Sequence, residues 1–236
     1  MIAPITILGE TGRLIALAKP AGLPVFPPHA APEGDCVLAR LLAARPEQGQ
    51  VTWPQGFEGG LAHRLDTPTS GLLLAARDPD SLSWIRSLFA EKRLDKRYRL
   101  VSARPVPWAE NRCALPIGHD PRRRDRMVVK RGANTPCRGA WLPADTSFRR
   151  LGPLGRGWTA WEAAMRSGVM HQIRVHAAFL GLPLAGDRLY GGGPPLDATA
   201  VPGLPPAAPF LLHHRRISGP GLDLPACPLP DWWPAG

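Results

Sequence analysis

The stretch His63-Arg64-Leu65-Asp66-Thr67-Pro68-Thr69-Ser70-Gly71-Leu72-Leu73-Leu74 joins a polar loop to an apolar run. Leu72 to Ala76 predicts a short buried strand, and Gly71 permits a tight backbone where the loop meets it. Asp66 follows the basic Arg64, and a nearby cation favours the charged form of a carboxyl group. An ionised carboxylate on an anchored loop can attack an electrophilic carbon. The alternative is an Asp that only caps a turn, and the residues by themselves favour that alternative.

Short elements are predicted on both sides of this stretch. Before it, Ile5 to Ala18 predicts a hairpin, and Cys36 to Ala44 predicts a short helix. After it, the pattern predicts a helix that is capped by Asp80 or Ser81, runs to about Lys92 and has an apolar stripe of Leu82, Ile85, Leu88 and Phe89. The elements predicted next are a strand over Tyr98–Val101, a basic loop or hairpin over Gly118–Gly132, a strand over Trp158–Met165 and a helix over Met170–Leu180. An extended proline-rich tail is predicted from Val201, with one further strand at Phe210-Leu211-Leu212.

The order of these elements predicts the fold class. Strands and helices alternate without regular βαβ spacing, which favours an α+β fold over a doubly wound one. The 236 residues suit one large domain or a domain of two lobes. Gly and Pro together make up 25 + 29 = 54 residues, a share just below that of low-complexity chains. We therefore expect a globular protein with many turns.

The charge of the chain is concentrated in one region. Lys and Arg outnumber Asp and Glu by 29 to 19, a net charge of +10. From Glu91 to Arg131 there are 13 basic and 5 acidic residues, so this stretch alone carries +8. An excess of this kind favours a polyanionic partner such as nucleic acid. A solvated basic surface that serves solubility is the alternative.

Other classes of protein are not indicated. The four cysteines show no C-x-x-C spacing, so no zinc site or redox pair is predicted. The N-terminal residues lack the pattern of a signal peptide, and no stretch approaches 18 apolar residues. We expect a cytoplasmic protein with reduced thiols and no membrane partner.

The stretch from His63 to Leu74 resembles the signature of the RluA-type RNA pseudouridine synthases. Further stretches resemble other blocks of that family in the same order, and together they cover the chain from about Ile5 to Pro230: Lys19-Pro20-Ala21-Gly22, Lys96-Arg97-Tyr98, His171-Gln172-Ile173-Arg174-Val175-His176 followed by Gly181, Pro183, Gly186-Asp187 and Tyr190-Gly191, and Leu211-Leu212-His213.

The chain also departs from the family pattern. Ser167-Gly168-Val169-Met170 stands where Thr-Gly-Arg usually precedes the third block, so a substrate or phosphate contact of that Arg is in question. His213-His214 replaces the typical His-Ala. The catalytic pattern begins almost at residue 1, so we expect a stand-alone catalytic domain without the N-terminal S4-type RNA-binding domain that is frequent in the family.

The resemblance implies the pseudouridine synthase fold, which is a mixed and largely antiparallel sheet flanked by helices and loops in two lobes with a central cleft. Residues 1–236 would form this single catalytic domain, with a proline-rich segment over residues 201–236 packed on it. The implied activity is isomerisation of specific uridines in structured RNA, a stem-loop of rRNA or tRNA, to pseudouridine. No metal or organic cofactor and no protein partner are implied, and we expect a monomer.

The resemblance also implies catalytic roles. Asp66 would be the nucleophile, through attack on the ribose C1′, attack on the uracil C6, or assistance to an elimination, and the sequence leaves these three routes open. Arg174 would pair with Asp66, because a guanidinium binds a carboxylate bidentately. Tyr98 would stack on the target base and relay a proton. For Arg174 and Tyr98 the alternatives are a surface Arg and a core Tyr.

Substrate-binding roles follow in the same way. Leu212 and Ile173 would line the pocket with apolar surface. Arg64 would fill the space that the extruded base leaves, with a simple ion pair as its alternative. His63 is given no catalytic role. Phosphates, which position RNA without reading its sequence, would be bound by Arg122, Arg123, Arg124 and Arg126 of the segment that continues to Lys130-Arg131.

Three other functions are weighed against this interpretation. A non-catalytic RNA-binding relative of the same fold would lack Asp66, Tyr98 or Arg174, and all three are present. An aspartate-nucleophile phosphohydrolase would show Asp-x-Asp-x-Thr after an apolar strand, whereas here the Asp precedes the strand. A metal hydrolase would need spacing such as His-Glu-x-x-His, which is missing around His63, His171, His176 and His213.

Overall fold

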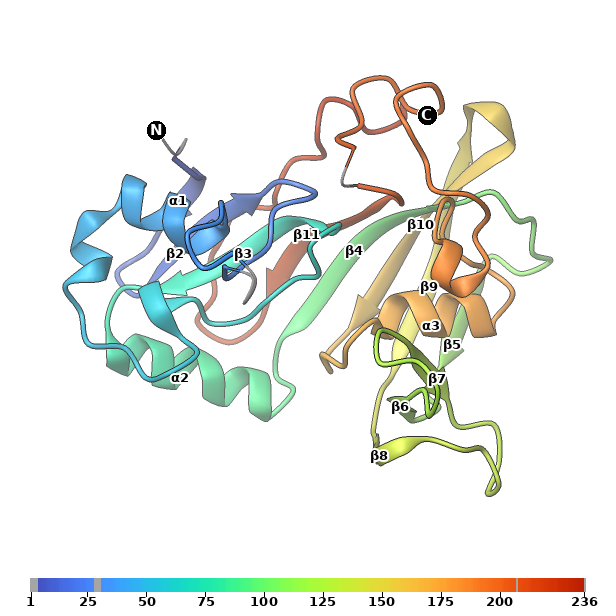
Figure 1. The fold of residues 1–236 in the computed structure, drawn as a ribbon, viewed down its shortest axis with the longest axis horizontal. Helices are drawn as coiled ribbons and strands as arrows, with labels where there is room; N and C mark the ends of the chain where they lie inside the picture. Colours follow the sequence, from blue (N-terminus) through green and yellow to red (C-terminus); the bar gives the residue numbers. More distant parts are fainter. Residues whose placement is uncertain (1–3, 28–30, 207, 236) are drawn as a thin grey trace. The chain divides into compact units, whose positions relative to one another are not determined.

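The computed structural model describes residues 4–27, 31–206 and 208–235, and in it the chain forms two compact units (Figure 1). Unit 1 consists of Met1–Leu94, Pro205–Ala208 and His213–Pro230. Unit 2 consists of Asp95–Leu204, Pro209–Leu212 and Asp231–Gly236. Residues 207 and 236, which lie outside the described ranges, belong to the predicted proline-rich tail.

Unit 1 is built on a small sheet. Strand β1 (Thr6–Glu10) pairs antiparallel with β2 (Leu14–Lys19), and β2 pairs antiparallel with β3 (Ser70–Ala76). The predicted hairpin and buried strand are therefore confirmed. Every residue of β3 is buried, which suits its central position. On the other side of β3, strand β11 (Leu212–Ser218) runs parallel to it.

Helices pack beside this sheet. Helix α1 (Val37–Ala44) agrees with the predicted helix over Cys36–Ala44, and Cys36 is its N-cap. Two short 3-10 helices follow, η1 (Pro46–Gly49) and η2 (Glu58–Gly60). The apolar stripe of α2 (Pro79–Ala90) joins the main core of unit 1. This core contains Leu82, Ile85 and Leu88 from α2 together with Leu14, Leu72, Leu74 and Ile217 from the strands.

The predicted N-cap of α2, Asp80 or Ser81, is wrong by two or three residues. The N-cap is Asp78, whose carboxylate accepts hydrogen bonds from the amide of Ser81 at 2.7 Å and from its hydroxyl at 2.9 Å. Pro79 follows directly, and its fixed φ suits the first helical position. Asp80 is therefore inside the helix, which ends at Ala90 rather than near Lys92.

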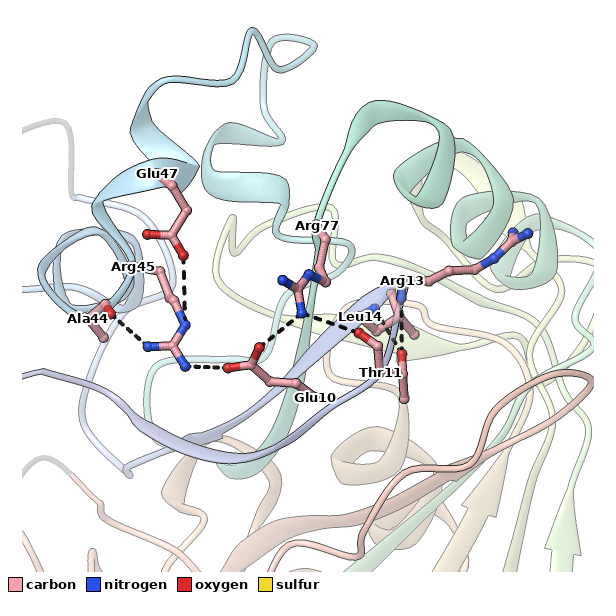
Figure 2. Close-up of polar contacts among 8 residues, drawn as sticks. All are labelled: Glu10, Thr11, Arg13, Leu14, Ala44, Arg45, Glu47 and Arg77. Carbon is pink, nitrogen blue, oxygen red and sulfur yellow. Dashed lines mark hydrogen bonds and ion pairs between the residues drawn. The ribbon is translucent and has the colours of Figure 1, made fainter.

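Glu10 ties three segments of unit 1 together at its surface (Figure 2). Its carboxylate pairs with Arg45 after α1 and accepts a hydrogen bond of 3.1 Å from Arg77 after β3. Arg45 also donates to the carbonyl of Ala44 at 2.9 Å. These side chains are partly exposed, and exposed ion pairs contribute little to stability.

The described part of unit 2 contains two sheets and one short α-helix. The larger sheet has the antiparallel order β4 (Asp95–Ser102), β10 (Trp158–Met165), β9 (Thr146–Leu154) and β5 (Glu110–Cys113). The smaller has β7 (Met127–Val129), β6 (Ile117–His119) and β8 (Arg138–Leu142), so the predicted basic hairpin is present. The helices are α3 (Gln172–Phe179), η3 (Gly155–Gly157) and η4 (Arg188–Tyr190). The α+β class is confirmed.

The proline-rich tail does more than lie over the surface. The predicted strand at residues 210–212 is displaced: β11 starts at Leu212 and continues to Ser218. His213 and His214 are buried, and farther on Leu224 and Cys227 join the core of unit 1. Two adjacent histidines do not look like the buried part of a strand in the sequence. Their burial is tolerated only because both rings find hydrogen-bond partners in the folded protein.

No helix in the described part of the chain is long and apolar enough to cross a membrane.

Candidate active-site residues

Asp66 lies on a turn whose backbone is held from two sides. The amide of Thr69 donates to the carbonyl of Asp66 at 3.0 Å and closes the turn. The carbonyl of Thr67 accepts from the amide of Gly22 at 2.9 Å and from the ammonium of Lys19 at 3.0 Å. The first and second blocks of the family resemblance are therefore in direct contact, and they hold a half-buried carboxylate in place.

Lys19 is the cation that the sequence analysis overlooked at this turn. Its side chain is only 2% exposed, and its ammonium also donates to the carbonyl of Pro20 at 2.9 Å. Burial lowers the pKa of Lys19 to about 7, and the negative charge of Asp66 opposes this shift. Arg64, the neighbouring cation expected from the sequence, is exposed. The signal for Lys19 was available, because Lys19 begins the first stretch that resembles the family.

The strand after the turn is locked to β11. Gly71 has a φ of +120°, and a Cβ atom there would lie 2.3 Å from the carbonyl oxygen of His214. Ser70 hydrogen-bonds to Nδ1 of His213 at 2.9 Å, and His214 donates from Nδ1 to the carbonyl of Leu72 at 2.7 Å. Burial lowers the pKa of His213 to about 4, so its ring is neutral at pH 7. Only glycine fits at position 71.

His63 orients the loop. Its Nε2 accepts a hydrogen bond of 3.2 Å from the amide of Leu74, and its ring centroid lies 5.1 Å from that of Phe89. These contacts tie the start of the signature to β3 and α2. They agree with a positioning role for His63, while Arg64 beside it points a long cation into solvent.

Arg174 is held inside unit 2 by a counter-charge. Its Nε donates to Oδ2 of Asp187 at 2.6 Å and its Nη2 donates to Oδ1 at 2.8 Å, while the two side chains are 7% and 1% exposed. The guanidinium carbon also lies 5.0 Å from the ring centroid of Tyr190 and 4.5 Å from that of Phe210. Such a pair is strong because it is bidentate and charge-assisted.

The Arg174–Asp187 pair adds a carboxylate that the sequence prediction did not include. Asp187 binds the Nε–Nη2 edge of Arg174 bidentately. Asp66 belongs to unit 1 and Arg174 to unit 2. Their pairing stays a prediction, and it would use the remaining Nη1 end of the guanidinium.

Asp187 is a candidate site residue that the sequence prediction did not include. It lies on a tight loop between two glycines that cannot be replaced without a clash. A Cβ at Gly186, where φ is +85°, would lie 2.1 Å from the carbonyl oxygen of Pro209, and one at Gly192 would lie 1.7 Å from that of Leu184. The Gly186-Asp187 pair within the third family block was the available signal.

Three other predicted site residues of unit 2, Tyr98, Ile173 and Leu212, are buried. Tyr98 is on β4, opposite Ala163 of β10, and Ile173 is in the first turn of α3. Leu212 begins β11. Burial agrees with an apolar wall, but stacking on a base and proton relay stay predictions.

Val169, which departs from the family pattern, packs within unit 2. Where the family usually has Arg, Val169 packs against the apolar cluster of Ile117, Met127, Val129 and Val175. Its amide donates to Oε1 of Gln172 at 3.1 Å, and the amide group of Gln172 donates to the carbonyl of Asp145 at 2.9 Å. The position is therefore part of the packing of unit 2.

The basic loop between β6 and β7 keeps several arginines without counter-charges. Asp120 accepts from the amides of Arg122 and Arg123 at 2.8 and 3.1 Å, and Asp125 pairs with Arg123 at 3.0 Å. Arg126 lies 3.8 Å from Asp120. Within the described ranges, no carboxylate lies within ion-pair distance of Arg122, Arg124 or Arg131, all of which are exposed. The loop therefore presents net positive charge.

His171 and His176 hydrogen-bond to other groups of unit 2. His176 hydrogen-bonds from Nδ1 to Thr146 and from Nε2 to the carbonyl of Leu115, each at 2.9 Å, and His171 hydrogen-bonds to Tyr190 at 2.9 Å. Among residues 4–27, 31–206 and 208–235, no group of three or more His, Cys, Asp and Glu residues could hold a metal ion.

Comparison with known proteins identifies the family. The family model for RNA pseudouridylate synthase matches residues 13–179. Relatives include an uncharacterised RNA pseudouridine synthase of Chloroflexus aurantiacus, 37% identical over 73% of this chain and 50% of its own length. Another is ribosomal large subunit pseudouridine synthase D of Nitrosomonas europaea, 34% identical over 84% of this chain and 53% of its own length. The chain thus spans about half the length of these relatives.

Two solved human structures share the fold. RNA pseudouridylate synthase domain containing 1 has a TM-score of 0.72 at 19% identity, over 98% of this chain and 85% of its own. RNA pseudouridylate synthase domain containing 4 has a TM-score of 0.69 at 25% identity, over 96% and 89%. Because the family model covers most of the chain, including the Asp66 turn and α3, the chain belongs to the RNA pseudouridylate synthase family, as its resemblance to the RluA type predicted.

Proposed function

We propose that this protein isomerises uridine in structured RNA to pseudouridine, with Asp66 as the nucleophile. The observation that carries the proposal is the Asp66 turn. The backbone carbonyls of this turn accept hydrogen bonds from Lys19, Gly22 and Thr69. The half-buried Asp66 side chain therefore stands on a rigid segment, which supports its role as a positioned nucleophile.

The proposed reaction balances within the uridine. The bond between N1 and C1′ breaks, the base rotates, a bond forms between C5 and C1′, and the proton that leaves C5 is matched by one gained at N1. Asp66 supports these steps by attack at C1′, attack at C6, or assistance to elimination. Arg174, fixed by Asp187, supplies a cation for the Asp66 carboxylate. Tyr98 stacks on the base and relays the proton.

The proposed substrate is a stem-loop of rRNA or tRNA. Extruding a base costs a few kcal/mol and costs least in an unpaired loop, and the exposed Arg64 has the length to fill the vacated space. Ile173 and Leu212 wall the base pocket. The relative from Nitrosomonas europaea is named for the large ribosomal subunit, which supports rRNA. We further propose that the protein acts as a monomer in the cytoplasm.

The first test replaces the proposed nucleophile. Asp66→Ala should reduce pseudouridine formation to background, because no other group would start the reaction. Chemical mapping of pseudouridine on total RNA, in cells with and without the gene, locates the uridine, and purified variants are then assayed on that RNA. Asp197→Ala is the matched control, since Asp197 caps a turn through the amides of Thr199 and Ala200.

The control variant should keep full activity. RNA affinity should stay near that of the natural protein in both variants. Residual modification by Asp66→Ala protein would contradict the nucleophile assignment. Tight RNA binding with no modified uridine in the natural protein would instead favour the non-catalytic RNA-binding relative.

The second test concerns the basic loop. Replacing Arg122, Arg123 and Arg124 by Ala should weaken RNA binding and lower the slope of log K against log salt by about 2 to 3. Fluorescence anisotropy between about 50 and 200 mM salt measures both quantities. Arg149→Ala is the control, because Arg149 is paired with Glu162 at 3.0 Å. An unchanged slope in the triple variant would mean that the loop does not bind phosphates.

A further inference from the structure

A groove of about 890 Å³ opens on unit 2 beside the basic loop. It lies between the β6–β7 hairpin, the turn over residues 131–135 and one face of α3. This volume is in the range of sites that hold small ligands. Its lining includes the buried apolar residues Met127, Val129 and Val175 and the half-buried Ala178, together with polar and charged side chains.

The rim combines an open aromatic ring with cations. Phe179 at the end of α3 is 38% exposed, and the guanidinium of Arg131 lies 5.9 Å from its ring centroid. Arg122 and Arg126 lie along the same groove. Exposing a phenyl ring to water is unfavourable, so a flat ligand that covers the ring of Phe179 would be stabilised. The guanidinium groups of Arg122, Arg126 and Arg131 in the same groove favour a ligand that is also anionic.

The groove has a positive net charge. Its acidic lining residue, Asp120, already accepts from two backbone amides and lies 3.8 Å from Arg126. For Arg122 and Arg131, no carboxylate of the described part of the chain is within ion-pair distance. A polyanion would therefore find uncompensated cations on two sides of the groove.

The walls of the groove are already built. The hydroxyl of Thr135 accepts from the amides of Arg131 and Gly132, each at 3.0 Å, and so fixes the turn that carries Arg131. On the opposite side, the phenolic oxygen of Tyr190 accepts from the amide of Met127 at 2.9 Å. A preformed site loses little entropy on binding.

We propose that this groove binds an unpaired nucleotide of the RNA substrate, with its base on Phe179 and its flanking phosphates on Arg122 and Arg131. The inference rests on the proposed RNA substrate and adds a second recognition site to it. Aromatic rings in basic grooves bind single-stranded nucleic acid, because every base has a face that can stack. An acidic peptide would use the cations but not the exposed ring.

The test separates base stacking from charge. A fluorescent decauridylate is compared with a decamer of the same phosphates that lacks bases. Phe179→Ala should weaken decauridylate binding about tenfold, the loss of one stack, and leave the binding of the abasic decamer unchanged. Phe179→Tyr, which keeps an aromatic ring, should bind decauridylate as tightly as the natural protein. Leu151→Ala, which removes another partly exposed apolar side chain of unit 2, should change neither.

Cross-linking locates the base directly. A decauridylate with 5-iodouridine, irradiated on the full-length protein, should cross-link to the peptide that contains Phe179. Equal weakening of both probes in Phe179→Ala, or cross-links only to other peptides, would overturn the proposal. Asp66→Ala protein should give the same cross-link, so a missing pseudouridine activity and a missing groove site are distinguishable results.

Discussion

The two residues of the proposed catalytic pair are held in opposite ways. Asp66 of unit 1 lies on a turn that is fixed through its backbone, with Lys19 and Gly22 as donors. Arg174 of unit 2 is fixed through its side chain, by Asp187 and two aromatic rings. The comparison teaches that a side chain can be positioned through the backbone that carries it or through its own ionic contacts, and that a buried cation needs a counter-charge.

The largest effect is expected from breaking the unit 2 arrangement. Asp187→Ala removes the buried carboxylate that binds Arg174 bidentately, and we expect a loss of about 3–5 kcal/mol in the free energy of unfolding. Urea denaturation followed by circular dichroism measures this loss. Asp145→Ala, which removes an exposed pair with Arg112, should cost at most about 1 kcal/mol. Equal losses in the two variants would contradict the distinction between buried and exposed pairs.

A smaller effect is expected at Lys19. Its pKa of about 7 in the folded protein lies below the ordinary value of 10.5. Between these pH values the unfolded chain holds a proton that the folded protein lacks, so the free energy of unfolding rises with pH, by up to about 1.4 kcal/mol per pH unit. Lys19→Met should remove this rise and, by loosening the turn, reduce pseudouridine formation about 10- to 100-fold.

Denaturation series from pH 6 to 10 provide the measurement. Lys96→Met is a matched control, because Lys96 is also buried and its pKa is lowered to about 8. That variant should keep the part of the rise that begins near pH 7. If Lys19→Met protein retained the same rise, Lys19 would not be the group that titrates.

The smallest effect is expected at Glu10, where an exposed carboxylate joins Arg45 and Arg77 (Figure 2). Glu10→Gln keeps the size of the side chain and removes its charge. We expect a loss of about 0–1 kcal/mol in the free energy of unfolding and no change in modification. Thermal unfolding of the natural and variant proteins at low salt and at 1 M salt measures this loss, which should shrink at high salt because salt screens exposed ion pairs. A loss above about 2 kcal/mol would place Glu10 with the buried pairs.

The sequence predicted elements well where the pattern was local. The strand over Trp158–Met165 has the predicted bounds, and Cys36 caps the helix it was expected to begin. The start of α2 was wrong because Asp78, Asp80 and Ser81 are all capable caps, and only the position of Pro79 decides among them. The strand β11 was displaced because the burial of His213 depends on Ser70, 143 residues away in the chain.

Within the candidate site, the same division applies. The family pattern identified Asp66, Arg174 and Tyr98 by residue type and order. It did not single out Lys19 or Asp187, because their importance comes from burial and from charges that are distant in the chain.

The amino-acid sequence by itself determined the α+β class, the family and the concentration of positive charge between residues 91 and 131. These follow from residue order and composition, which need no partner to be recognised. Only the tertiary structure decided that Lys19 supports the Asp66 turn, that Asp187 holds Arg174, and that Phe179 opens into a basic groove. Burial, pairing and exposure are properties of neighbours in space, and chain order does not state which neighbours those are.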